Sequence, residues 1–196
     1  MSDTANGLAM SKPGQGSRIE RIDTLGLRTA ANDMPDDDEP MTVPPDGWKH
    51  TGVRVVPGDQ LDENTAQTPG MNRAAAINLA RVGARKLWAG TVHIHANAKT
   101  GAHHHGPLES VIYVIRGRAR MRWGEKLEFV AEAGPGDFIY VPPFVPHQEI
   151  NASSDETLEC VLVRSDNEAV VVNLDIEPAE KPEAVAWVDP IHRAPE

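Results

Sequence analysis

From Gly101 to Gly117 the chain reads Gly-Ala-His-His-His-Gly-Pro-Leu-Glu-Ser-Val-Ile-Tyr-Val-Ile-Arg-Gly. Consecutive histidines and a nearby carboxylate come first, and an apolar, β-branched run follows and stops at a glycine. Because side chains alternate faces along an extended strand, His103 and His105 point the same way and His104 points away. Two imidazoles on one face, with Glu109 a short distance further on, indicate part of a metal-binding shell.

A second patterned stretch runs from Gly136 to Asn151 and reads Gly-Asp-Phe-Ile-Tyr-Val-Pro-Pro-Phe-Val-Pro-His-Gln-Glu-Ile-Asn. His147 in this stretch could supply a third imidazole. The prolines at 142, 143 and 146 stiffen the backbone before it and so fix where the ring points.

The two stretches resemble the paired motifs of the cupin superfamily. The first motif, G-x5-H-x-H-x3,4-E-x6-G, is matched at His103, His105, Glu109 and Gly117, with Asn97 in the place of the opening glycine. The second motif, G-x5-P-x-G-x2-H-x3-N, is matched at Gly136, Pro142, His147 and Asn151, with Phe144 in the place of the inner glycine. The resemblance covers residues 85–175 and implies an all-β fold, the cupin double-stranded β-helix or jelly-roll barrel, of about six to eight strands.

The spacing of the first motif departs from the family pattern at one point. Seven residues separate Glu109 from Gly117, where the motif has six, and counting back from Gly117 puts Ser110 in the carboxylate position. Either a bulge in the strand turns Glu109 inward, or the site has three histidines and an open position, which resembles some cupin-like dioxygenases. We predict a metal site formed by His103, His105, Glu109 and His147.

Composition narrows the class of protein and of partner. The chain has 196 residues, 40% hydrophobic and 24% charged, which is typical of a soluble domain with a core of its own and an appendage. A net charge of −10 argues against nucleic acid as a partner, because phosphate binding needs a basic face. No apolar run is long enough for a membrane span, and the single cysteine excludes an intrachain disulfide. We therefore expect a cytoplasmic protein that binds neither membrane nor nucleic acid.

Three segments follow from the distribution of turn residues. We expect an irregular N-terminal arm over residues 1–50, a cupin barrel over 51–176, and a C-terminal tail rich in proline and glutamate over 177–196. The arm is too polar to form a core, yet it carries scattered apolar residues such as Ile19, Ile22 and Leu25. We predict a homodimer in which part of residues 15–50 packs against a barrel, with that of the partner as one option. The alternative is an arm that wraps its own barrel or a flexible tail.

Several strands are predicted from alternation and turn signals. Residues 52–56 and 74–79 are each interpreted as strands, the second despite its alanines. In residues 87–96, Val92 and Ile94 share an apolar face, so His93 and His95 are expected to point away from the site. Cys160 is expected in the core, since free cysteines are commonly buried.

The ligand set points to one divalent metal ion, iron, manganese, nickel or zinc, with open coordination positions. We expect a metal-dependent enzyme of the oxygenase, dioxygenase-like type acting on a small oxygenated organic substrate. The alternatives are a non-redox isomerase or lyase, and a binding protein without turnover. Tyr113, Tyr140 and Phe144 are candidates for the substrate pocket, with Tyr113 facing inward only if Glu109 does. No catalytic residue is assigned.

Overall fold

The computed structural model describes residues 47–65, 67–167 and 170–188, so the predicted N-terminal arm lies almost entirely outside the described residues. The helical elements are short: α1 (Trp48–Thr51), a 3-10 turn (Gly58–Gln60) and α2 (Leu79–Val82). The strands are β1 (Met71–Ile77), β2 (Trp88–Ile94), β3 (His103–His104), β4 (Ser110–Arg116), β5 (Ala119–Trp123), β6 (Phe129–Ala133), β7 (Phe138–Val141), β8 (His147–Asn151), β9 (Leu158–Arg164), β10 (Val172–Asn173) and β11 (Glu183–Ala184).

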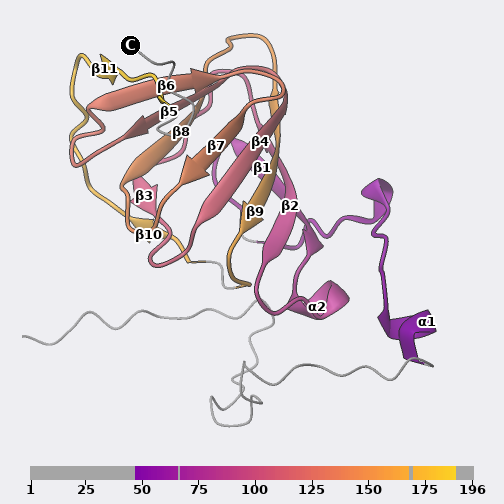
Figure 1. The fold of residues 1–196 in the computed structure, drawn as a ribbon. Helices are drawn as coiled ribbons and strands as arrows, with labels where there is room; N and C mark the ends of the chain where they lie inside the picture. Colours follow the sequence, from indigo (N-terminus) through magenta and orange to yellow (C-terminus); the bar gives the residue numbers. More distant parts are fainter. Residues whose placement is uncertain (1–46, 66, 168–169, 189–196) are drawn as a thin grey trace, which may run out of the picture.

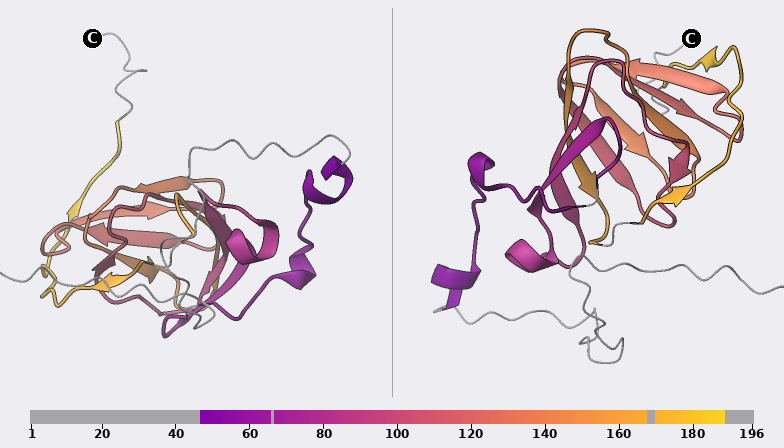
Figure 2. Two further views of the ribbon diagram at one scale, coloured as in Figure 1. Left: turned by 90° about the horizontal axis from the view of Figure 1, so that it is seen from below. Right: turned by 180° about the vertical axis from the view of Figure 1, so that it is seen from behind.

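These strands form two sheets that pack face to face (Figure 1). One sheet has the order β1-β2-β9-β4-β7 and the other the order β10-β3-β8-β5-β6-β11. Apart from the short parallel pair β6–β11, the neighbouring strands are antiparallel, and chain-distant strands such as β3 and β8 lie side by side. Two further views show the same layers from below and behind (Figure 2). This jelly-roll architecture confirms the predicted all-β fold.

Alternating burial along the strands shows why this sequence folds into two facing sheets. In β9 the buried positions Leu158, Cys160 and Leu162 alternate with half-buried ones, as the period of a strand requires. The core draws on both sheets and includes Met71, Val92, Ile94, Ile112, Val114, Ala119, Met121, Val141, Leu158, Cys160 and Leu162. Cys160 is 3% exposed, as expected.

Three positions at which the cupin motifs have glycine adopt a left-handed backbone conformation, although only one of them is glycine in this chain. Gly117 has a φ of 87°, and a Cβ there would lie 2.9 Å from the Cα of Leu158. Asn97 and Phe144, which stand in for motif glycines, keep the left-handed conformation, each with a φ of 60°. Such a conformation costs a bulky residue on the order of 1–3 kcal/mol, so the turn before His147 is held by its surroundings.

Some predicted boundaries differ from the structure. Residues 52–56 are not a strand, and Val53 and Val55 are exposed, because no neighbouring strand pairs with them among the described residues. Residues 71–77 do form a strand, but the chain turns into α2 at Leu79. The sheet also extends past residue 176, since β11 pairs with β6. None of the helices in the described ranges has the length and apolar character needed to span a membrane.

Candidate metal centre

Three histidines from both motifs converge at one end of the barrel. His103 lies in β3 directly opposite His147 of β8, and His105 follows β3 on the same face as His103. One ligand nitrogen from each lies within 4.8 Å of the other two. The rings are close, with centroids 4.4 Å apart for His103 and His147. The alternation of residues 103–105 thus brings together the three predicted imidazole ligands.

Burial keeps these imidazoles neutral. His103, His105 and His147 are 4%, 3% and 1% exposed. Desolvation is the largest cause of a lowered pKa at each of them, and with the nearby Arg164 cation it lowers the pKa of His105 to about 2. Neutral imidazole is the form that binds a metal ion.

The backbone also fixes which nitrogen of each ring is available. Nδ1 lies 2.9 Å from the carbonyl oxygen of Gly101 in His103, 2.8 Å from that of Val170 in His105, and 2.9 Å from that of Val145 in His147. A carbonyl oxygen only accepts, so each Nδ1 carries the proton and each Nε2 has a lone pair. Nε2 of His147 is buried and has no hydrogen-bond partner among the described residues. This donor set fits a divalent ion such as iron, manganese, nickel or zinc.

Glu109 does not join the three histidines, which corrects the predicted ligand set. Its side chain is exposed on the outside of the barrel, where its Oε1 accepts a hydrogen bond of 2.6 Å from the hydroxyl of Tyr140. The register of β4 against β9 does shift, between Val114 and Arg116, but this bulge lies past Glu109 and leaves its direction unchanged. Ser110 takes the inward position and is 2% exposed.

The three candidate pocket aromatics lie at the surface instead. Tyr113 and Tyr140 alternate with buried β4 and β7 residues and are 36% and 57% exposed. Tyr113 faces outward because Glu109 does, and its ring packs on Phe138 with centroids 4.8 Å apart. Phe144 is 62% exposed, with its ring centroid 6.0 Å from that of His104.

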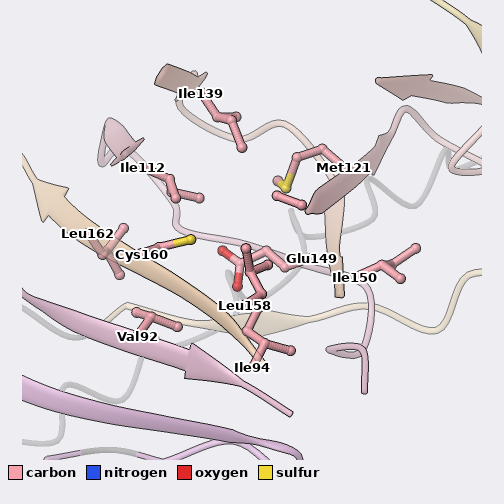
Figure 3. A pocket seen from close by; sticks show the side chains of 11 residues that line it. Val92, Ile94, Ile112, Met121, Ile139, Glu149, Ile150, Leu158, Cys160 and Leu162 are labelled. Carbon is pink, nitrogen blue, oxygen red and sulfur yellow. The ribbon is translucent and has the colours of Figure 1, made fainter. Parts of the chain in front are cut away.

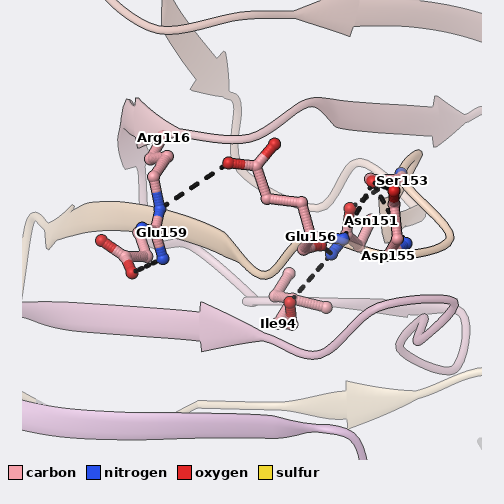
Figure 4. A network of polar contacts seen from close by, with 7 residues as sticks. All are labelled: Ile94, Arg116, Asn151, Ser153, Asp155, Glu156 and Glu159. Carbon is pink, nitrogen blue, oxygen red and sulfur yellow. Dashed lines mark hydrogen bonds and ion pairs between the residues drawn. The ribbon is translucent and has the colours of Figure 1, made fainter.

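The remaining motif residues have structural roles. Asn151 donates from its Nδ2 to the carbonyl oxygens of Ile94 and Glu156, and its Oδ1 accepts from the backbone N–H of Ser153 (Figure 4). Nδ2 also lies 3.2 Å from the carbonyl oxygen of His95. Asn151 therefore fastens the turn after β8 to the end of β2. His93 and His95 are exposed and point away from the site, as predicted.

Polar residues that the sequence did not assign to the site are buried near the histidines. Arg164 ends β9 and is 6% exposed, and its Nη2 lies 3.1 Å from Nε2 of His105. The alternation Leu158, Cys160, Leu162 continues to Arg164, so the same pattern that predicted the core could have found it. Arg73 and Glu149 are also buried, at 8% each.

The barrel interior also holds a small cavity. Its volume is about 20 Å³, room for about one water molecule. Glu149 points its carboxylate into this cavity among apolar side chains, with Leu158 and Cys160 nearby (Figure 3). Burial, followed by the charge of Glu149, raises the pKa of the Cys160 thiol to about 12. The three histidines are not among the residues that line this cavity.

Comparisons with known proteins agree with this geometry. Residues 90–164 match the family model described as "Cupin domain". Among solved structures, the polyketide cyclase RemF from Streptomyces resistomycificus is similar at 21% identity and a TM-score of 0.54, covering 66% of this chain and 89% of that one. An uncharacterized conserved protein with a double-stranded β-helix domain from Klebsiella pneumoniae gives 18% identity and a TM-score of 0.50, covering 63% of this chain and 98% of that one. No curated protein matches the sequence.

Proposed function

The chain belongs to the cupin superfamily, and we propose that it is a metal-dependent enzyme, an oxygenase that acts on a small oxygenated organic substrate. One observation supports this proposal above the others: three buried, neutral imidazoles each bring a ligand nitrogen within 4.8 Å of the other two. Three protein ligands leave coordination positions open, which distinguishes catalytic from closed structural sites.

The protein's own residues prepare this site for a metal ion. The carbonyl oxygens of Gly101, Val145 and Val170 hold each ring in one tautomer and one orientation. Burial excludes water from the rings and keeps them unprotonated. A bound iron or manganese ion supplies redox chemistry with dioxygen, whereas zinc polarises a substrate or activates water without redox chemistry.

Anaerobic reconstitution tests the oxygenase proposal. The protein is loaded separately with iron, manganese, nickel and zinc, and oxygen uptake is measured with a panel of diketones, catechols and thiols. Uptake with a redox-active metal and none with zinc is the expected result. Absence of turnover with every redox-active metal, in protein shown by elemental analysis to be loaded, contradicts the oxygenase assignment.

A second candidate is a non-redox enzyme that uses the metal as a Lewis acid, such as an isomerase, lyase or cyclase. Among the residues that the structure describes, the histidine group includes no carboxylate, which favours this candidate because three-histidine sites also suit catalytic zinc. The structurally similar RemF is named a polyketide cyclase. Activity that persists with zinc and without oxygen supports this candidate over the oxygenase.

We also propose that the protein forms a homodimer. In the five-stranded sheet, β7 is an edge strand, and Phe138 and Tyr140 are 72% and 57% exposed along it. An apolar edge of this kind suits a second copy of the chain.

Deleting residues 1–45 and measuring the mass of the protein in solution tests whether the N-terminal arm takes part in dimer formation. A truncated protein that stays dimeric with an unchanged melting temperature shows that the arm contributes nothing to assembly.

A further inference from the structure

Arg164 and Ser110 form a second polar group beside the histidines. They are direct partners in the β4–β9 register, and both side chains face inward, at 6% and 2% exposed. Nε of Arg164 and Oγ of Ser110 are buried and make no hydrogen bond with any of the described residues. Buried polar atoms are normally satisfied, so two orphans on facing residues point to an absent partner.

The position of this pair in the motif is informative. Six residues separate Ser110 from Gly117, the spacing at which the first cupin motif has its carboxylate ligand. The structure puts a short hydroxyl there and an arginine opposite it. The site therefore lacks one negative charge that the motif supplies and has gained a positive one.

Within the described part of the chain, no carboxylate contacts the guanidinium of Arg164. Among the described residues, its side chain makes one hydrogen bond, to the neutral His105, and the buried Glu149 forms no ion pair with it. A guanidinium stays protonated in proteins, so Arg164 is charged at neutral pH. A buried charge is costly unless it is paired.

A bound metal ion would add to the uncompensated positive charge of Arg164. Nε2 of His105 has one lone pair, so it cannot bind a metal ion and accept the hydrogen bond from Arg164 at once. Loading the site thus removes the arginine's one acceptor and brings a second positive charge near it. An anion that meets both charges resolves the conflict, and the fork of a guanidinium matches a carboxylate.

We infer that Arg164 and Ser110 bind a carboxylate group of the substrate beside the metal ion, in the position that the motif glutamate occupies in other cupins. The substrate class is then a small organic acid. This inference rests on the proposed metal-dependent function and narrows its substrate, but it does not depend on whether the reaction uses oxygen.

Cobalt(II) provides a test that needs no turnover. The full-length protein is loaded with Co²⁺ in carboxylate-free buffer under argon, and acetate, oxalate or inorganic phosphate is titrated in while the cobalt absorption bands and the heat of binding are recorded. We expect the two carboxylates to bind with a spectral change and phosphate to bind more weakly. Equal or tighter phosphate binding overturns the assignment to carboxylates.

Substitution of Arg164 should move two affinities in opposite directions. In Arg164→Gln we expect carboxylate binding to weaken about 10-fold or more, since a charge-assisted pair is lost. Cobalt binding without added anion should become tighter, because a repelling charge and a competing hydrogen bond are gone. A purely structural role for Arg164 would weaken both. The matched control is Arg116→Gln, which removes an outward arginine of β4 paired with Glu159.

Ser110→Ala keeps the test decisive if Arg164→Gln does not fold. It removes only the buried hydroxyl, and we expect carboxylate binding to weaken about threefold, the loss of one modest hydrogen bond. Unchanged carboxylate affinity in both folded variants, or in Ser110→Ala alone if only it folds, overturns the inference while leaving the metal site intact. Failure of wild type to bind cobalt would instead refute the metal-dependent function and the inference with it, whereas absence of oxygen uptake bears on the oxygenase proposal only.

Discussion

Glu109 and Ser110 are adjacent in the sequence, yet they belong to two opposite regions of the molecule. Ser110, Ile112 and Val114 form the inner face of β4, which is buried against the histidine end and the core. Glu109, Tyr113 and the β7 residues Phe138 and Tyr140 form the outer face, which is exposed. The carboxylate of Glu109 and the phenol of Tyr113 thus lie outside the barrel, and the hydroxyl of Ser110 lies inside it. Direction along the strand, rather than residue type, therefore determines which side chains can take part in the site.

The largest effect is expected for loss of an inner histidine. His147→Ala removes one of three Nε2 ligands and should weaken binding of a divalent metal by about 1,000-fold, or about 4 kcal/mol. His95→Ala, which removes an exposed histidine, serves as the control and should leave metal binding unchanged. Calorimetry with zinc measures both. Full metal affinity in His147→Ala would exclude a site shared by the two motifs.

The next effect contrasts neighbouring residues of β4. Ile112→Ala should lower the free energy of unfolding by about 2–5 kcal/mol, because it leaves a cavity in the core. Tyr113→Ala, one residue away on the outer face, should cost about 1 kcal/mol or less, since its ring is exposed. Urea unfolding curves give both values. Similar losses in the two variants would contradict the assigned directions of the side chains.

Low pH should destabilise the metal-free protein because the three buried histidines resist protonation in the folded state. Burial lowers the pKa of all three histidines, so below about pH 6.5 the unfolded chain takes up protons that the folded chain does not. Stability is thus present above that pH and falls by about 1.4 kcal/mol per pH unit for each such histidine. Urea unfolding at pH 7.5, 6.5 and 5.5 measures the slope. His147→Gln should flatten it, and a slope equal to that of wild type would show that His147 does not contribute.

The smallest effect is expected on the outer face. Glu109→Gln should change zinc affinity by less than about twofold and stability by less than about 0.5 kcal/mol, as for exposed pairs in general. Tyr140→Phe removes the same hydrogen bond from the other side and is the matched control. A clear loss of zinc affinity in Glu109→Gln, without a loss in Tyr140→Phe, would restore the carboxylate to the metal site.

The sequence sufficed for the parts of the site that depend on spacing. His103 and His105 share a face because they are two residues apart, and the second motif supplied His147 independently. The direction of the Glu109 side chain could not be predicted from spacing alone. Counting motif positions forward from His105 makes Glu109 the inward carboxylate, whereas counting back from Gly117 puts Ser110 in that position. The bulge near Val114 comes too late to turn Glu109, and only the structure shows its place.

Other differences reflect tertiary pairing that no local pattern contains. Residues 52–56 have the β-branched composition of a strand but find no partner among the described residues, whereas the polar β11 pairs with β6. Arg164 is a different case. Its inward direction followed from the alternation of β9, but a charged residue at the end of a strand is ordinarily expected in solvent.

The hydrogen bond from His105 to the carbonyl oxygen of Val170 has a consequence for local opening of the chain. Val170 leads into β10, whose residues Val172 and Asn173 pair with His104 and His103, and Leu174 donates its N–H to the carbonyl oxygen of Ala102. Local unfolding of β10 would break the hydrogen bond to Val170, and His105 would then no longer be held in one tautomer. A ligand that binds the histidines only when β10 is paired therefore stabilises the paired state and makes this local unfolding rarer. The exchange rate of the Leu174 amide becomes a reporter of site occupancy, read at a backbone group that the ligand never touches.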